Sequence, residues 1–315
     1  MRVMVIGATG AIGTRLVPRL CEAGHEVIGT SRSADRAAGL RVLGARPVVL
    51  DVLDAGAVRA AVAAAQPDAI VYQATALAGV RILRSLDRAF AATNRVRTEG
   101  VDNVLAAANE AGVRRLVAQS FAPYRYARDG GWVKTEADQL EAAPPASARQ
   151  TFAAMQHLEQ AVTAAGGIAL RYGGFYGPGD EGLVRPVRKR QTPLVGDGAG
   201  VMSFVHLDDA AEATVLALDH EGPAIYSIVD DEPAPMRDWL PVLAGVVGAR
   251  PPRHVPVWLA RLIAGGGLAM ITEARGSSNT RAKRELGWAP RYSSWRQGFA
   301  AAYGKARELH QAREV

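Results

Sequence analysis

Short apolar runs alternate with amphipathic stretches along the first half of the chain. The apolar runs are four or five residues long and rich in Val, Ile, Leu and Ala, which is typical of buried parallel strands. Between them, apolar residues recur three and four positions apart, which is typical of helices that pack one face against a sheet. The pattern therefore predicts six strands, at residues 3–6, 26–30, 47–50, 69–72, 115–118 and 168–171.

Helices are predicted in the intervals between these strands. The first ends at Gly24, and an alanine-rich helix covers residues 55–65. A long helix runs to about residue 111, and another covers 151–165. Regular alternation of strands and helices predicts an α/β fold with a Rossmann-type, doubly wound parallel sheet. Right-handed crossovers place helices on both faces of that sheet.

The alternation breaks down after the sixth strand, where Gly and Pro become frequent. Residues 201–205 and 224–228 look like two further strands separated by a helix. We predict a dinucleotide-binding Rossmann domain over 1–172 and a smaller, mixed α/β substrate-binding lobe over 173–315. The strand and helix near 201–218 are expected to return to the Rossmann part.

Three glycines, one at every third position, separate the first predicted strand from the first helix. A backbone without Cβ atoms can turn sharply there and let a diphosphate approach closely. The start of the helix adds free N–H groups and a partial positive charge. We therefore predict a dinucleotide site at this loop, formed by Gly7, Thr9, Gly10, Ala11, Ile12 and Gly13.

The end of the second strand indicates which dinucleotide binds. An acidic side chain there would bond the ribose 2′-hydroxyl and repel a 2′-phosphate. The strand ends instead in Thr30, Ser31 and Arg32, and a guanidinium beside short hydroxyl donors suits a phosphate. NADP is therefore predicted as the cofactor. NAD is the alternative, because Asp35 is near enough in sequence to reach a ribose.

Asp51 follows the third strand. From that position its carboxylate can accept a hydrogen bond from the adenine amine, with Val52 beside it. A helix or turn cap is an equally good interpretation of an aspartate at the end of a strand. Both interpretations stay open.

Composition changes this picture little. The net charge of +6 comes from arginines scattered along the chain, which favours a solvated basic face over a nucleic-acid site. The single cysteine, Cys21, excludes an internal disulfide and fits a reducing cytoplasm. We expect a cytoplasmic protein without a leader or a membrane span. Because no histidine stands at metal-ligand spacing from another histidine or from Cys21, we also expect no metal.

The chain resembles the NAD-dependent epimerase/dehydratase family, the extended and atypical branch of the short-chain dehydrogenases/reductases. The glycine loop is the first support, and five more stretches follow in the family's order, at 73–76, 100–105, 170–179, 204–211 and 283–290. The resemblance implies that a first group lies beneath the nicotinamide ribose, comprising Gln73, Ala74 and Thr75. It implies that a second group lies beside the nicotinamide, comprising Tyr172, Gly173, Gly174 and Phe175.

The resemblance fails at the family's usual catalytic pair, Tyr-x-x-x-Lys. Glu159 fits the family's glutamate four residues beyond the lysine, which places Thr151 at the tyrosine and Met155 at the lysine. A threonine hydroxyl is a far weaker acid than a phenol, and a thioether neither carries charge nor donates a proton. The candidate replacements are hydroxyls at the end of the fifth strand and in the loop after it: Ser120, Tyr124 and Tyr126.

An apolar stripe marks the helix that would carry this pair. It consists of Phe152, Met155, Leu158 and Val162. In the family the corresponding helix packs against a partner subunit. The resemblance therefore implies a homodimer that forms through the helices near 95–111 and 151–165.

These observations predict an NADP-dependent oxidoreductase that moves hydride between the nicotinamide and a carbonyl or secondary alcohol carbon of a small molecule. Two alternatives stay open. One is a sugar-nucleotide epimerase or dehydratase that retains NAD(H), with Arg185, Arg188 and Arg281 on a diphosphate. The other is a non-catalytic sensor that reports redox state to a partner protein.

Overall fold

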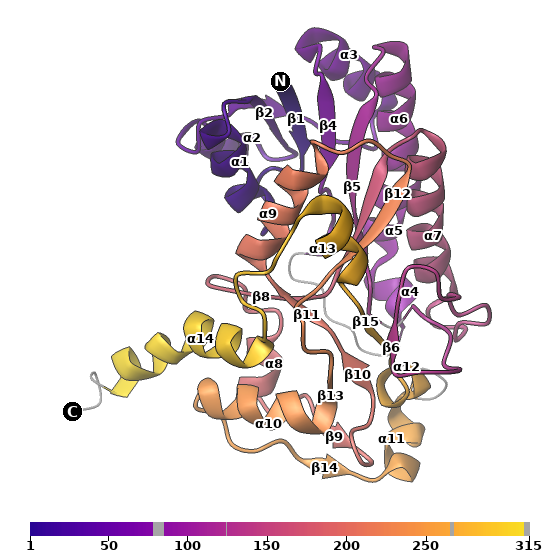
Figure 1. Ribbon diagram of the computed structural model, residues 1–315, viewed down its shortest axis with the longest axis vertical. Coiled ribbons are helices and arrows are strands. Elements are labelled where there is room, and N and C mark those ends of the chain that lie inside the picture. The colour runs from indigo at the N-terminus through magenta and orange to yellow at the C-terminus, as the bar shows by residue number, and fades with distance from the viewer. Residues whose placement is uncertain (78–84, 124, 265–267, 312–315) are drawn as a thin grey trace.

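The main body of the protein is an α/β fold built on a sheet of seven parallel strands (Figure 1). The computed structural model describes residues 1–77, 85–123, 125–264 and 268–311. The strands stand in the order β12-β7-β5-β4-β1-β2-β3, and all neighbours are parallel. They are β1 (Arg2–Ile6), β2 (Glu26–Ser31), β3 (Arg46–Val49), β4 (Ala69–Tyr72), β5 (Arg115–Phe121), β7 (Ile168–Tyr172) and β12 (Ala224–Ile228).

Two sets of helices cover the two faces of this sheet (Figure 1). One face carries α1 (Gly13–Glu22) and α9 (Leu207–Ala217), and the other carries α3 (Ala55–Ala65), α6 (Val101–Glu110) and α7 (Arg149–Ala164). Successive strand side chains point to opposite faces. Val3 and Val5 accordingly lie in the core beneath α1, whereas Met4 and Ile6 lie in the core beneath α3. A short helix, α2 (Ala34–Ala38), and a 3-10 turn, η1 (Gly39–Arg41), join β2 to β3.

The six predicted strands and the α/β architecture are confirmed, but the long helix predicted up to residue 111 is not one helix. It is divided into α4 (Leu86–Ala89), α5 (Ala91–Arg95), a π-helical turn η2 (Val96–Gly100) and α6. Tyr72 accounts for the irregular turn, because its hydroxyl donates to the main-chain oxygen of Val96 at 2.6 Å. A side chain that takes a carbonyl from the helical ladder produces such a bulge. At Gly100 a Cβ atom would lie 2.7 Å from the Tyr72 hydroxyl oxygen.

The strand predicted over 201–205 is interrupted at Ser203. The first piece, β10 (Val201–Met202), pairs antiparallel with β13 (Ala234–Pro235). The second, β11 (Phe204–His206), pairs parallel with β8 (Gly174–Tyr176). The Ser203 hydroxyl accepts from the Ser277 main-chain nitrogen at 2.8 Å and donates to its oxygen at 3.2 Å, which fixes the break. The strand predicted over 224–228 is β12, which extends the large sheet beside β7.

Most of the remaining elements form a lobe at the end of the sheet where the strands finish, whereas α13 (Thr280–Leu286) packs beside α9 against the sheet (Figure 1). The core of the lobe holds buried aromatic side chains, among them Phe204, Trp239, Trp295 and Phe299. The pairs β9–β14 and β6–β15 are short and parallel. The further elements are β6 (Val133–Lys134), α8 (Val184–Arg188), β9 (Leu194–Val195), α10 (Met236–Val246), β14 (His254–Val255), α11 (Val257–Ala264), α12 (Leu268–Thr272), β15 (Gly276–Ser277) and α14 (Trp295–Gln311).

The part of the chain that the structure describes contains neither a membrane-spanning helix nor a cluster of metal ligands. None of its helices combines the length and the apolar character that crossing a bilayer requires. No group of three or more His, Cys, Asp or Glu side chains could hold a metal ion there.

Candidate functional site

The glycine loop between β1 and α1 has the backbone geometry of an anion cradle. Gly7 has a φ of 86°, and a Cβ atom there would lie 2.8 Å from the main-chain carbon and oxygen of Gln73. At Gly13 a Cβ atom would lie 2.5 Å from the Ala8 oxygen, so only glycine lets α1 start so close to the loop. Ile12 precedes α1 and offers no side-chain cap. The amides at the start of α1 therefore suit the diphosphate of a dinucleotide.

Hydroxyl groups at the tip of β2 hold this loop in place. The Thr30 hydroxyl accepts from the main-chain nitrogen of Gly7 at 3.3 Å, and Thr9 donates to the Ser31 hydroxyl at 3.2 Å. Thr30 and Ser31 are buried, whereas Arg32 is exposed. The strand tip has no carboxylate, and Asp35 lies exposed in the first turn of α2.

Arg36, which sequence reasoning missed, adds a second cation at this tip. Its Nη2 donates to the main-chain oxygen of Thr9 at 2.6 Å, which brings the guanidinium onto the glycine loop. Ser33 caps α2 and accepts from the Arg36 nitrogen. The available signal was a second arginine four residues after Arg32, in the short helix that follows the strand tip.

The structure places Asp51 in a turn. One of its carboxylate oxygens accepts from the main-chain nitrogen of Leu53 at 3.0 Å, so the turn-cap interpretation is correct. Contact with an adenine stays a prediction. The oxygen of the neighbouring Val52 accepts from the Asn103 side chain at 2.9 Å, which ties this turn to α6.

Gln73 and Tyr172 meet inside the protein at the ends of β4 and β7. The Gln73 amide donates to the Tyr172 hydroxyl at 3.2 Å, and that hydroxyl lies 2.6 Å from the Thr214 hydroxyl of α9. Burial raises the pKa of Tyr172 to about 12, so its phenol stays protonated. Gln73 and Thr214 thus hold the Tyr172 hydroxyl inside the protein, and contacts of Gln73 and Tyr172 with a nicotinamide stay predictions.

The main chain from Gly173 onward runs close to its neighbours. A Cβ atom at Gly173 would lie 2.8 Å from the Ser203 oxygen. The Phe175 ring packs on Tyr172, with ring centroids 5.4 Å apart. Gly174, Ala74 and Thr75 are partly exposed at the same edge. Their contacts with a nicotinamide stay predictions.

Thr151 and Met155 lie buried on α7. Asp87 accepts from the main-chain nitrogen and the hydroxyl of Thr151, both at 2.8 Å, and the Asn94 amide donates to that hydroxyl at 3.2 Å. Met155 packs in an apolar cluster with Phe152, Ala148 and the partly buried Leu86, Phe121 and Met270. Neither side chain offers a cation or a phenol. Their assignment to the family's catalytic pair rests on the spacing from Glu159.

The apolar stripe on α7 faces the chain's own interior. Leu158 and Val162 pack against the sheet, and Phe152 and Met155 pack in the cluster just described. All four residues are buried. The stripe therefore offers no open face to a partner, and the homodimer stays a prediction.

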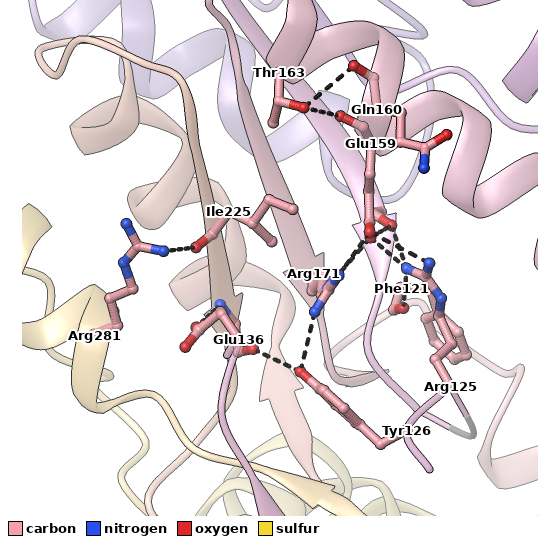
Figure 2. Close-up of polar contacts among 12 residues, drawn as sticks. Phe121, Arg125, Tyr126, Glu136, Glu159, Gln160, Thr163, Arg171, Ile225 and Arg281 are labelled. Atoms are coloured by element: carbon pink, nitrogen blue, oxygen red, sulfur yellow. Dashed lines mark hydrogen bonds and ion pairs between the residues drawn. The ribbon is translucent and has the colours of Figure 1, made fainter. Parts of the chain in front are cut away.

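Beside this cluster, Glu159 stands at the centre of a buried network (Figure 2). It accepts from the Ser120 hydroxyl at 2.5 Å and from Arg171 at 2.7 and 3.0 Å. Arg125 also donates to both carboxylate oxygens of Glu159, and its Nη2 lies 3.3 Å from Oε2. Burial alone would raise the pKa of Glu159, but the two guanidinium groups lower it to about 2. The carboxylate is therefore ionised at neutral pH.

The predicted proton donors Ser120 and Tyr126 belong to this network. Ser120 accepts from Arg125 at 3.2 Å as well as donating to Glu159. The Tyr126 hydroxyl lies 3.4 Å from the Ser227 hydroxyl and accepts from Arg171 at 3.4 Å (Figure 2). Both side chains are buried, and Tyr124 lies outside the described residues. Proton donation by any of them stays a prediction.

Arg125 and Arg171 were missed as members of this site. A signal was present for Arg171, because an arginine inside the apolar run of β7 must have a buried counterion. Arg125 follows β5 in an irregular segment, and nothing in the local pattern distinguishes it from a surface residue.

The chain is similar to known proteins along most of its length. A model of the NAD-dependent epimerase/dehydratase family matches residues 3–228. A 3-diazoavenalumate denitrifying reductase from Streptomyces sp is 44% identical over 309 residues, which cover 95% of this chain and 99% of that protein. A 2-alkyl-3-oxoalkanoate reductase from Stenotrophomonas maltophilia is 30% identical over 263 residues, which cover 79% of this chain and 76% of that protein.

A solved structure shares the fold. The UDP-glucose 4-epimerase from Thermotoga maritima superposes with a TM-score of 0.75 at 20% identity, covering 98% of this chain and all of that one. The likeness at this identity concerns the architecture alone.

Proposed function

The chain belongs to the NAD-dependent epimerase/dehydratase family, and from this premise we propose that it is an NADPH-dependent reductase of an aromatic diazo compound. Its similarity to reductases makes it an oxidoreductase of this family that uses a nicotinamide dinucleotide. The choice of NADP and the chemical class of the substrate are the parts that we propose. Reduction of a carbonyl carbon is the second candidate.

The cofactor site supports NADP. The cradle at Gly7 and Gly13 suits a diphosphate, and Arg32 and Arg36 present two guanidinium groups at the strand tip that lacks a carboxylate. Arginine binds phosphate in a fixed, bidentate geometry. When bound, the reduced nicotinamide supplies a hydride. We infer that the two arginines hold the 2′-phosphate that distinguishes NADP from NAD.

The diazo substrate is carried over from the relative that is 44% identical along nearly the whole of both chains. That protein is named for 3-diazoavenalumate and for denitrification. We transfer the diazo group to this chain and propose an aromatic ring as its carrier, and we do not transfer the rest of the molecule.

The observation that carries the proposal is that Thr151 and Met155, which stand on α7 where the resemblance expects the catalytic pair, provide neither a phenol nor a cation. A ketone that accepts hydride at carbon becomes an alkoxide, which needs a proton on oxygen. An aryl diazonium carbon that accepts hydride forms a C–H bond, while the C–N bond breaks and its electron pair leaves with N₂. No proton is transferred in that step. Thr151, bonded to Asp87, and the apolar Met155 are compatible with such chemistry.

The carbonyl candidate, which includes the predicted ketone and secondary alcohol, is favoured by the relative that is 30% identical and named as an oxoalkanoate reductase. It requires a proton donor, for which Ser120 and Tyr126 are the described candidates. Both hydroxyls are enclosed in the Glu159 network. A ketone substrate would therefore have to draw its proton through that network or from Tyr124.

The other two alternatives have less support. A sugar-nucleotide enzyme was expected to use Arg185, Arg188 and Arg281 on a diphosphate. However, Arg188 pairs with Glu181 at 3.1 Å and Arg281 pairs with Glu285 at 2.9 Å. The non-catalytic sensor is set aside because the chain is similar to enzymes over nearly its full length.

One experiment separates the two substrate classes. The purified protein is mixed with NADPH that carries deuterium at the transferable position and with either an arenediazonium salt or a panel of ketones. NADPH consumption, released N₂ and the position of deuterium are measured, with a protein-free mixture as control. We expect N₂ release and deuterium on the ring carbon that lost nitrogen.

Two results would contradict the proposal in different ways. Deuterated alcohols without N₂ would establish the carbonyl candidate. NADPH consumption no faster than in the protein-free mixture, with either substrate class, would refute both candidates.

Two expectations about the protein's surroundings enter as proposals of their own. We propose that it works in the cytoplasm without nucleic acid or membrane as a partner, and that it forms a homodimer through the outer faces of α6 and α7. Sedimentation velocity across a dilution series tests the dimer.

A further inference from the structure

Four buried charged side chains gather beside the ends of β5 and β7: Arg97, Arg125, Arg171 and Glu159. None of the four is more than 5% exposed. Glu159 forms ion pairs with Arg125 and Arg171. Arg97 lies near enough for the charges of Arg125 and Glu159 to act on its pKa. Three buried guanidinium groups and one buried carboxylate leave an excess of positive charge in the interior. We refer to these four residues as the arginine group.

Arg97 is the member without a counterion within hydrogen-bond distance among the described residues. It lies on the π-helical turn η2, and its Nη1 is buried with no hydrogen-bond partner. Burial and the nearby Arg125 charge lower the pKa of Arg97 to about 10. The guanidinium therefore remains protonated at neutral pH. A buried cation with an unused donor is costly unless it has a role.

Two hydrogen bonds show where Arg97 lies along α7. The Asn94 amide bonds the Thr151 hydroxyl at 3.2 Å, and Asp102 bonds the His157 ring at 2.7 Å. In the sequence, Arg97 lies between Asn94 and Asp102. Met155 lies between Thr151 and His157 on the other side of these contacts. The η2 turn that carries Arg97 therefore runs alongside the stretch of α7 that holds Met155, where the family's lysine is expected.

The acidic side chains near this end of the sheet compensate the excess positive charge of the arginine group only in part. Asp87 accepts from the main-chain nitrogens of Gln150 and Thr151 at the start of α7. Glu136 accepts from the Ser227 nitrogen. Both acids are partly exposed, so water screens their charges more than it screens the enclosed arginine group. Lys134, also nearby, pairs with Asp129 and Asp138.

We propose that the arginine group makes the site discriminate between the two redox forms of its cofactor, favouring the reduced form. The oxidised nicotinamide ring carries a positive charge and the reduced ring carries none, whereas the rest of the molecule is the same. Positive charge fixed in a low-dielectric interior beside the predicted nicotinamide end therefore opposes the oxidised form. The discrimination helps the spent cofactor to leave once the hydride has been transferred.

This inference rests on the proposed function only in that the protein must bind NADP(H). Dissociation constants for NADPH and NADP⁺ are measured separately by calorimetry on the full chain, without substrate. We expect the wild type to bind NADPH more tightly. Arg97→Met should reduce the ratio of the two constants by on the order of tenfold, the effect of one charge acting across about 10 Å of protein.

Two matched variants distinguish the charge from the fold. Arg97→Lys keeps the charge and is expected to retain most of the wild-type ratio. Arg36 contacts the glycine loop. Arg36→Gln should weaken the binding of NADPH and of NADP⁺ by the same factor, because both forms carry the same phosphate. Circular dichroism verifies that each variant is folded.

Each outcome decides between the alternatives. If Arg97→Met weakened the binding of NADPH and of NADP⁺ by the same factor, the proposal would be overturned. So would a wild type that binds NADP⁺ as tightly as NADPH, and this measurement needs no variant to fold. A wild type that binds neither form would refute the proposed function instead.

Discussion

The Ser120 hydroxyl donates to the Glu159 carboxylate across 2.5 Å in the interior of the protein. The same carboxylate pairs with Arg125 and Arg171, so a single acid on α7 connects β5, β7 and the segment after β5. A hydroxyl in this position contributes to stability whether or not it also moves a proton. These two roles can be separated by substitution.

Replacement of Ser120 by Ala tests the proton-donor hypothesis. Loss of the hydrogen bond is expected to lower the free energy of unfolding by about 1–3 kcal/mol, as for other buried polar partners. The rate of diazo reduction should be almost unchanged. If Ser120 instead donated the proton to a ketone, the rate of ketone reduction should fall by roughly a hundredfold or more. Urea unfolding and single-turnover NADPH oxidation are the measurements. Ser227→Ala, at the other end of the network, is the control.

Replacement of Glu159 by Gln leaves Arg125 and Arg171 without their counterion. Unpairing a buried charge in this way is expected to cost about 3–5 kcal/mol of stability. Denaturant unfolding followed by circular dichroism measures the loss. The exposed pair of Arg59 and Glu110, 2.8 Å apart, offers the control: Glu110→Gln should cost no more than about 1 kcal/mol. Similar losses in the two variants would show that the buried network does not stabilise the fold.

Acid should weaken the fold through the same carboxylate. The pKa of Glu159 is lowered from 4.5 to about 2 in the folded protein, so its stabilising effect is complete above pH 4.5. The contribution is lost as the pH falls from about 4.5 toward 2, because the unfolded state then takes up the proton first. Unfolding free energies measured along this range should fall more steeply in the wild type than in Glu159→Gln. Parallel curves would exclude Glu159 as a source of acid sensitivity.

Cofactor choice can be tested at the tip of β2. Arg32→Gln and Arg36→Gln are each expected to weaken NADPH binding by about tenfold or more, the value of a lost charge-assisted hydrogen bond, and to leave NADH binding unchanged. Fluorescence titration measures both. Arg41→Gln, on the η1 turn, is the control. A wild type that binds NADH as tightly as NADPH would contradict the assignment of NADP.

The π-helical turn can be tested through Gly100 and Tyr72. Gly100→Ala places a methyl group 2.7 Å from the Tyr72 hydroxyl oxygen and 2.8 Å from a Val52 methyl. We expect a loss of about 1–3 kcal/mol from overpacking. Tyr72→Phe removes one of the two clashing atoms, so the double variant should lose less than the sum of the single losses. Additive losses would show that the hydroxyl does not shape this turn.

Local pattern was sufficient for much of the fold. The strands of the first half follow from apolar runs, and the helix predicted over 55–65 has the bounds of α3. The cradle at Gly7 follows from glycine spacing, because the positive φ and the close approach to Gln73 are properties of the main chain. Such features depend on neighbours in sequence or on the regular geometry of a parallel sheet.

The features that were missed depend on contacts between distant residues. The π-helical turn exists because Tyr72, 24 positions before Val96, bonds its carbonyl. The split at Ser203 depends on Ser277, 74 positions away. Arg125 looks like a surface residue in its own segment and becomes buried only through Glu159, 34 positions later. Hydrophobic periodicity contains no information on such pairs.

The late arrival of β12 has a consequence for how the chain is synthesised. Residues 224–228 complete the sheet beside β7, but they leave the ribosome only after much of the lobe has been made. Until then β7 is an apolar edge strand that pairs only with β5, and such an open edge readily joins other chains. A nascent or truncated chain that ends near residue 172 therefore exposes this edge, and the protein depends on its later half to keep its first half from aggregating.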